Sequence, residues 1–204
     1  DQAVSRGLGD VYKRQIGSLA ISDGSSSASN YSLTGALSMA ITKRPVTVTG
    51  SKFYDGTTNA AASNLTSFAN LVSGETLSLS GNGSVASSAV GSNKSVSHQT
   101  LALANGSGAA SNYSLGNVTI NVNKRILSLD GIRAFDGNTT VSSSDISTFG
   151  NIVSGESLTL SGSGTVTNAN AGMNKSLTLG SLSLSDGSGN ASNYTLSGGI
   201  HTFD

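Results

Sequence analysis

The chain contains no cysteine, no tryptophan and a single proline, and its few charged residues, 11% of the total, sum to a net charge of zero. Without thiolates, and with only His98 and His201 as histidines, it offers few ligands for a transition metal, so we expect no metal and no cofactor. The neutral charge lacks the cationic field that nucleic-acid binding requires. No stretch approaches the roughly 18 apolar residues that span a bilayer, so we expect no membrane insertion.

The residues that are abundant favour an all-β protein. Ser, Thr and Asn make up roughly two-fifths of the chain, far above ordinary globular usage, and there are 26 glycines. These residues are poor in helix interiors, because Ser and Asn compete for backbone hydrogen bonds and Thr is restricted at its first torsion. At 36% hydrophobic, the chain still has enough apolar surface to fold.

Internal repetition dominates the sequence. Lys43-Arg44 recurs as Lys124-Arg125, a spacing of 124 − 43 = 81 residues, and the same spacing relates residues 68–75 to 149–156 and 111–113 to 192–194. Such ungapped self-similarity indicates a tandem duplication. We therefore define repeat 1 as residues 43–123 and repeat 2 as residues 124–204. A unit of this size is large enough for a core of its own.

Two shorter segments precede the repeats. The motif Ser29-Asn30-Tyr31-Ser32-Leu33 matches residues 111–115, so residues 16–42 are interpreted as the C-terminal end of a truncated repeat from a longer array. Residues 1–15 share no pattern with the rest, and we interpret them as a non-native, adapter-like leader.

Within each repeat the apolar residues alternate, as Val46 and Val48 do with Thr47 and Thr49, which is typical of strands with one buried face. Turn formers such as Asp55-Gly56 and Asn105-Gly106 separate the strands. We predict five or six strands per repeat joined mainly as hairpins, with a helical turn near residues 63–68. The predicted fold class is all-β, with tandem small β-sandwich or β-grasp-like modules arranged as an elongated rod.

The strongest local motif spans residues 52–58 and recurs at residues 133–139. Both copies keep an aromatic ring, a carboxylate, a glycine and a hydroxyl. The ring is predicted to fill the core, because loss of the hydroxyl in the second copy is compatible with packing and not with catalysis. Each Asp is predicted to accept a backbone N–H in an Asx-turn that its glycine completes, with a calcium ligand as the alternative. The motif residues are Tyr54, Asp55, Gly56 and Thr58 in repeat 1 and Phe135, Asp136, Gly137 and Thr139 in repeat 2.

A second recurring segment ends in Tyr31, Tyr113 and Tyr194, which we predict to begin the last strand of each copy and to pack inward. The oxygen-rich turns before them could bind calcium, but Asn105 replaces Asp23 and Asp186, which favours an ordinary polar loop.

No arrangement of residues predicts catalysis. Glu75 and Glu156 are equivalent positions in different repeats, and neither repeat supplies a second carboxylate at a repeated place for acid–base chemistry. Lys43-Arg44 and Lys124-Arg125 stand where the repeats begin, where they are either solvated linker charges or, alternatively, a dibasic protease site. The short connection between the repeats should restrict their rotation.

The order of these short motifs resembles the YDG-type repeat. The resemblance rests on residues 41–48, 52–58, 71–75, 91–95 and 110–115, and repeat 2 departs from it at Phe135, Asn138 and Thr140. YDG-type repeats occur in tandem, often beside MBG repeats, in large secreted bacterial adhesins similar to filamentous haemagglutinin. The resemblance implies a β-rich module of a protein secreted from, or displayed on, the outer surface of a Gram-negative bacterium, and it brings no catalytic residues.

From these observations we expect a structural stalk or spacer without enzymatic activity. Its partners would be the neighbouring repeats of the same chain. The alternative is a β module that binds a glycan or a host surface protein.

Overall fold

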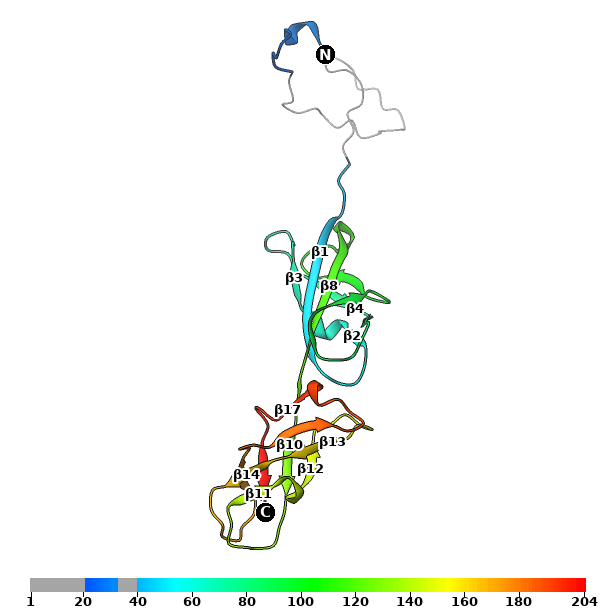
Figure 1. The fold of residues 1–204 in the computed structure, drawn as a ribbon. Helices are drawn as coiled ribbons and strands as arrows, with labels where there is room; N and C mark the ends of the chain where they lie inside the picture. The colour runs from blue at the N-terminus through cyan, green and yellow to red at the C-terminus, as the bar shows by residue number, and fades with distance from the viewer. Residues whose placement is uncertain (1–20, 33–39) are drawn as a thin grey trace. The chain divides into compact units, whose positions relative to one another are not determined.

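The computed structural model describes residues 21–32 and 40–204 (Figure 1). Lys43–Asp204 form one compact unit that holds both repeats, and the chain before Lys43 forms another. The predicted leader lies outside the described residues. In the described part of residues 16–42 there is one 3-10 turn, η1 (Ala28–Asn30), whose Ala28 N–H donates to Asp23 Oδ1 at 2.5 Å.

The inward packing predicted for Tyr31 is wrong, because its side chain is 64% exposed. The corresponding Tyr113 packs against Val46 and Leu77 in a buried cluster. Among the described residues, Tyr31 belongs to no such cluster, so its ring stays in solvent.

Repeat 1 contains eight strands and two 3-10 turns, more strands than predicted. They are β1 (Arg44–Phe53), β2 (Asn59–Ala61), η2 (Ala62–Asn64), β3 (Ser67–Ala69), β4 (Leu77–Ser80), β5 (Asn82–Val85), β6 (Gly91–Ser97), β7 (Ala102–Asn105), η3 (Ala110–Asn112) and β8 (Tyr113–Asn123). The predicted helical turn near residues 63–68 is the shorter η2, which no side chain caps.

Repeat 2 follows the same order, with its first and last strands each broken in two. Its elements are β9 (Arg125–Ile126), β10 (Ser128–Gly131), β11 (Thr140–Ser142), η4 (Ser143–Asp145), β12 (Ile146–Gly150), β13 (Leu158–Ser161), β14 (Ser163–Val166), β15 (Lys175–Thr178), β16 (Ser183–Asp186), η5 (Ala191–Asn193), β17 (Tyr194–Thr195) and β18 (His201–Phe203). The described residues contain no α-helix, so the all-β prediction is confirmed.

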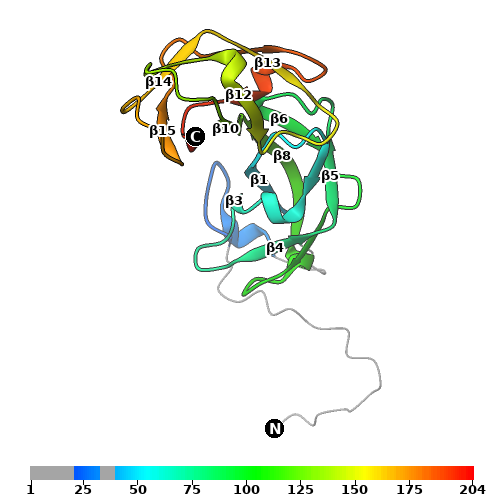
Figure 2. The same ribbon diagram turned by 90° about the horizontal axis from the view of Figure 1, so that it is seen from below.

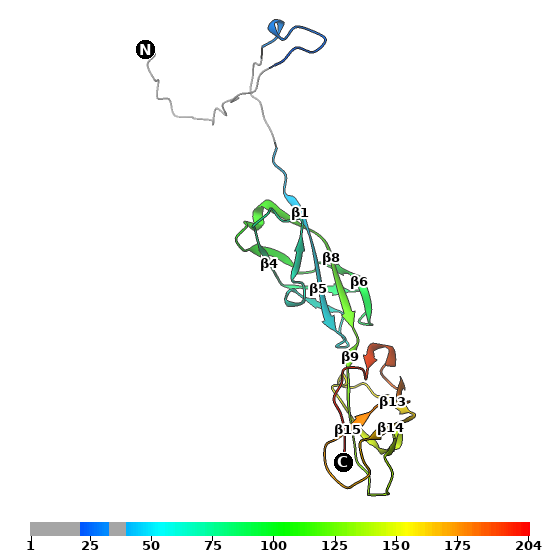
Figure 3. The same ribbon diagram turned by 90° about the vertical axis from the view of Figure 1, so that its left-hand side faces the viewer.

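The first and last strands of each repeat pair in parallel. In repeat 1, β1 lies beside β8 from the Arg44–Tyr113 pair to the Phe53–Asn123 pair, as Figures 1 and 3 show. In repeat 2, β9 and β10 pair in the same way with β17 and β18. Because both strands run the same way, the chain enters a repeat at one end and leaves it at the other.

This pairing corrects the expectation that hairpins dominate. The main sheet of repeat 1 has the order β2-β5-β6-β8-β1-β3, and β4 pairs with β7 separately. Of these pairs, only β5 and β6 are consecutive antiparallel strands. Repeat 2 has the matching order β11-β14-β15-β18-β10-β12, and Figure 2 shows that the strands of both repeats are strongly curled. Turn residues reveal where the chain reverses but not which strands then pair.

The alternating pattern correctly locates the buried face. Val46 and Val48 of β1 are fully buried, and Val118 and Ile120 of β8, which are buried too, lie across from Val48 and Gly50. Gly50 continues the buried side of β1, and a Cβ there would lie 1.8 Å from the carbonyl oxygen of Asn64, so only glycine allows η2 to pass. The core of repeat 2, built on Leu127, Leu129 and their neighbours, also takes in Tyr54 and Val122 from repeat 1.

In the stretches 21–32 and 40–204, there is no helix of sufficient length and apolar character to span a membrane.

Candidate functional site

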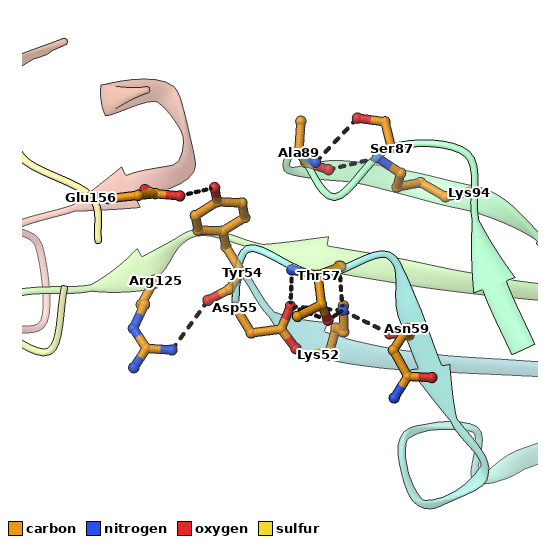
Figure 4. Close-up of polar contacts among 10 residues, drawn as sticks. All are labelled: Lys52, Tyr54, Asp55, Thr57, Asn59, Ser87, Ala89, Lys94, Arg125 and Glu156. Carbon is orange, nitrogen blue, oxygen red and sulfur yellow. Dashed lines mark hydrogen bonds and ion pairs between the residues drawn. The ribbon is translucent and has the colours of Figure 1, made fainter. Parts of the chain in front are cut away.

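The residue 52–58 motif forms a tight turn built around a buried lysine. Lys52 is 8% exposed, and its Nζ donates to Asp55 Oδ1 at 2.9 Å, to the Thr57 carbonyl at 2.9 Å and to the Asn59 carbonyl at 2.7 Å (Figure 4). The predicted Asx bond is present, since the Thr57 N–H donates to Asp55 Oδ1 at 2.9 Å. Gly56 completes the turn at a φ of +76°.

Asp55 is held in its charged form by this arrangement. Its partial burial alone would raise the carboxyl pKa, but the Lys52 ammonium and the Thr57 N–H and hydroxyl outweigh that effect and lower the pKa below its ordinary value. The ion pair and the turn therefore stabilise one another.

Repeat 2 builds the same turn with an arginine. The Asn138 N–H donates to Asp136 Oδ1 at 2.9 Å, and this bond lowers the Asp136 pKa. Arg133 replaces Lys52, donates to the Asn138 and Thr140 carbonyls, and lies 3.2 Å from Asp136. Gly137 has a φ of +77°.

The sequence suggests that the hydroxyl of Thr58 or Thr139 is the group that the motif retains, but the structure shows a different role for these threonines. Thr58 and Thr139 act through their carbonyls, which accept the N–H groups of Val85 and Val166 at 2.9 Å in both repeats. The hydroxyl that bonds to the turn carboxylate is that of Thr57, at 2.9 Å from Asp55 Oδ1.

Tyr54, the aromatic residue of the motif, contacts the next repeat. Its N–H donates to the Asn123 carbonyl at 2.8 Å, which places it at the end where the chain leaves repeat 1. Its ring is 5% exposed and meets the ring of Tyr194 edge to face, with centroids 5.4 Å apart and planes at 79°. The prediction that this ring is structural fits its burial, but the core it joins is that of repeat 2.

Glu156 receives both tyrosine hydroxyls. The Tyr54 hydroxyl donates to Oε1 and the Tyr194 hydroxyl to Oε2, each at 2.5 Å. Burial, followed by the hydrogen bond to this carboxylate, raises the pKa of Tyr194 to about 12, and the same two causes raise the pKa of Tyr54. Both phenols are therefore fixed as neutral donors, and Glu156 is a structural acceptor in the joint between the repeats.

Three further contacts cross the joint. Arg125 Nη1 donates to the Tyr54 carbonyl at 3.3 Å, while Nε and Nη2 donate to Asn151 at 2.5 and 2.7 Å. The Val90 N–H donates to Oδ1 of Asn193, a residue 5% exposed, at 3.0 Å. Gly56 approaches so closely that a Cβ there would lie 3.1 Å from Val153 Cγ1. The expectation that the dibasic pair is a solvated linker is thus wrong for Arg125, which binds both repeats.

The core role predicted for Phe135 is wrong. Its ring is 70% exposed, and a Cβ on Gly137, two residues further on, would meet nothing within 4 Å. Tyr54 is covered by the core of repeat 2, whereas no described residue covers the Phe135 ring in the same way. The predicted Tyr113 and Tyr194 do begin β8 and β17 and are 3% and 1% exposed.

The sequence reasoning missed Lys52, Glu156, Arg125 and Asn193 as site residues. Each has a counterpart 81 residues away, namely Arg133, Glu75, Arg44 and Asn112, so the repetition was the signal that could have found them. The sequence raises Glu156 only in connection with acid–base chemistry and predicts that the tyrosines fill the cores of their own repeats, so it does not indicate the bonds between them.

Within residues 21–32 and 40–204, no three His, Cys, Asp or Glu side chains gather to hold a metal ion. The turn carboxylates at Asp55 and Asp136 instead face basic side chains and backbone N–H groups.

These features define a tandem-repeat β protein whose consecutive modules share a polar and aromatic joint. The family model described as the YDG domain matches the chain twice, at residues 41–120 and 126–200. The chain therefore belongs to the YDG domain family. Searches of curated proteins and of solved structures found no match.

Proposed function

We propose that the two YDG repeats are spacer modules in the stalk of a large bacterial adhesin, secreted or displayed on the outer surface of a Gram-negative cell. The observation that carries the proposal is the joint, in which Tyr54 of repeat 1 is buried in the core of repeat 2 and bonded to Glu156. A spacer has to hold each module in a fixed orientation relative to the next. A joint in which side chains of both repeats pack together resists bending.

The strand pairing supports the same role. Since β1 and β8 are parallel, each repeat carries the chain forward instead of returning it to its starting end. The 10 residues of β1 span roughly 33 Å at about 3.3 Å per residue, which sets the advance per module. We expect successive repeats to extend the protein as a rod.

We assign no catalysis to the repeats. Glu75 and Glu156, the carboxylates that recur at equivalent positions, both accept tyrosine hydroxyls. Each carboxylate is positioned by a tyrosine hydroxyl of its own repeat, which favours a structural role.

Electron–electron distance measurement between two spin labels tests the rigid joint. The chain has no cysteine, so Ser97→Cys and Thr178→Cys introduce labels at exposed, equivalent positions of β6 and β15. We expect one narrow distance distribution, which Tyr54→Ala should broaden. A distribution already broad in the chain with Tyr54 intact would contradict the spacer role.

The cellular context has its own test. Antibodies raised against the repeats should label intact cells of the source bacterium or its culture medium. Labelling only after the cells are lysed would contradict the surface location.

A second candidate is a glycan-binding or host-protein-binding module. It is favoured by the exposed Phe135 ring, which borders a shallow pocket lined also by Arg133, Asn168 and Lys175, because sugar sites commonly present an aromatic face beside polar groups. Glycan-array binding that Phe135→Ala abolishes would favour this function over the spacer.

A further inference from the structure

Repeat 1 carries, at its opposite end, the same set of groups with which repeat 2 holds Tyr54. In repeat 2 this acceptor face consists of Arg125, Val153, Glu156, Asn193 and Tyr194. Its counterpart in repeat 1, which we call the outer acceptor face, consists of Arg44, Val72, Glu75, Asn112 and Tyr113.

The outer acceptor face is already assembled. The Tyr113 hydroxyl donates to Glu75 Oε2 and accepts the Val72 N–H at 3.2 Å, as the Tyr194 hydroxyl does with Glu156 and the Val153 N–H at 3.2 Å. The bond to Glu75 raises the pKa of Tyr113, which keeps this phenol neutral.

Its arginine is anchored in the same way. Arg44 donates through Nε and Nη2 to Asn70 at 2.8 and 2.9 Å, matching the grip of Arg125 on Asn151. No movement is required to make this face resemble the one that holds Tyr54.

Three groups on this face lack the partners that their counterparts have. In repeat 2, Glu156 Oε1 accepts the Tyr54 hydroxyl, Arg125 Nη1 donates to the Tyr54 carbonyl, and Asn193 Oδ1 accepts the Val90 N–H. Among the described residues, nothing fills the corresponding places on Glu75, Arg44 and Asn112.

Exposure shows the same contrast. Val72 is 46% exposed, whereas Val153 is partly covered, and Asn112 is exposed, whereas Asn193 is buried. The face therefore presents a carboxylate oxygen, a guanidinium nitrogen and an amide oxygen beside an apolar side chain. Together these groups are complementary to a tyrosine ring, its hydroxyl and the main chain around it.

We propose that the outer acceptor face is a docking site for the Tyr-Asp-Gly turn of a further YDG repeat joined ahead of Lys43. The sequence supports this occupant, because Ser29-Asn30-Tyr31 leads to Lys43-Arg44 as Ser111-Asn112-Tyr113 leads to Lys124-Arg125. This inference rests on the proposed function as a tandem array and adds the rule by which repeats recognise one another.

The rule requires tyrosine at the docking position. A phenylalanine would place its ring against the apolar residues but would leave Glu75 Oε1 without a donor. Phe135 thus marks repeat 2 as a weaker donor than repeat 1, and Phe135→Tyr should restore the missing group.

A three-repeat chain tests the proposal. A second copy of residues 43–123 is inserted between Asn123 and Lys124, so that the Tyr54 turn of the first copy meets the acceptor face of the inserted copy. The measurement is the melting temperature of chains with Glu→Gln at one acceptor face at a time.

In the original chain, Glu156→Gln should lower the melting temperature by about 3–6 °C, and Glu75→Gln by less than about 2 °C. In the three-repeat chain, Gln at the Glu75 position of the inserted copy should produce the larger shift, and Gln in the first copy the smaller one. Equal small shifts in the two copies would overturn the proposal.

A second measurement applies if the three-repeat chain does not fold. In the original chain with Phe135→Tyr, the amide resonances of Val72 and Asn112 should shift as the protein concentration rises from micromolar to millimolar, through contact between copies. The added Glu75→Gln change should remove the shift. Resonances independent of concentration would then overturn docking, whereas failure of the spacer role would appear separately in the spin-label distances of the existing joint.

Discussion

Replacing Tyr54 should destabilise repeat 2, although Tyr54 belongs to repeat 1 in sequence. The ring is 5% exposed, packs edge to face on Tyr194 and bonds to Glu156. Truncating a buried aromatic side chain to alanine costs about 3–5 kcal/mol, and because this ring lies in a joint we expect about 3 kcal/mol for Tyr54→Ala. Within that figure the edge-to-face pair contributes about 1 kcal/mol.

Tyr54→Phe isolates the hydroxyl. A hydrogen bond to a charged group contributes about 1.5–3 kcal/mol, and the lower end applies because Glu156 keeps its bond from Tyr194 and remains partly exposed. We expect a loss of about 1.5 kcal/mol, half of the alanine effect.

The assay is urea unfolding at neutral pH followed by far-ultraviolet circular dichroism, with Phe135→Ala as the matched control. Phe135 occupies the equivalent position but is 70% exposed, so its truncation should change the unfolding free energy by no more than about 0.5 kcal/mol. Tyr54→Ala should shift the unfolding transition of repeat 2 to lower urea concentration, because the core of repeat 2 contains the Tyr54 ring. If Tyr54→Ala and Phe135→Ala cost the same, the joint does not stabilise repeat 2 and the reasoning fails.

Three further predictions concern the turn and the joint. Asp55→Ala should lower the unfolding free energy by about 1 kcal/mol, because the Thr57 N–H and the Lys52 ammonium lose an acceptor; an unchanged urea midpoint would refute this. Folding raises the pKa of Tyr194 from 10.0 to about 12, so the stability that it contributes is complete below pH 10 and is lost as the pH rises toward 12; urea midpoints measured across this range should fall, and a flat profile would show that the phenol is not held neutral. Asn193→Ala should cost about 1–2 kcal/mol, since it orphans the Val90 N–H, whereas Asn112→Ala should be nearly neutral by the same unfolding measurement; equal effects would contradict the docking contact.

Much of the local structure could be predicted from the sequence, because it depends on neighbouring residues. The alternation of Val46 and Val48 with threonines identifies the buried face of β1, and Asp55-Gly56 predicts both an Asx bond and a positive φ. These features need only the period of a strand and the geometry of four consecutive residues.

The pairing of strands could not be predicted in this way. The parallel contact of β1 with β8 joins residues about 70 positions apart, such as Val48 and Val118, and no local motif encodes it. The prediction of hairpins followed from turn residues alone, and it missed that the two ends of a repeat lie side by side.

The roles of the aromatic residues illustrate the same limit. Tyr54 and Phe135 occupy equivalent places in nearly the same motif, yet one is 5% exposed and the other 70%. The motif does not encode this difference in burial, because the residues that cover Tyr54 belong to repeat 2 and lie far from the motif in sequence.

By itself the sequence determined the duplication, the β character, the turn chemistry and the family, since each is written in the order and spacing of residues within one repeat. Only the tertiary structure decided that Tyr54, Glu156 and Tyr194 meet, and that Arg125 and Asn193 complete the joint. The physical reason is that burial and hydrogen bonding depend on distances between segments far apart in the chain, which strand pairing sets and residue spacing does not.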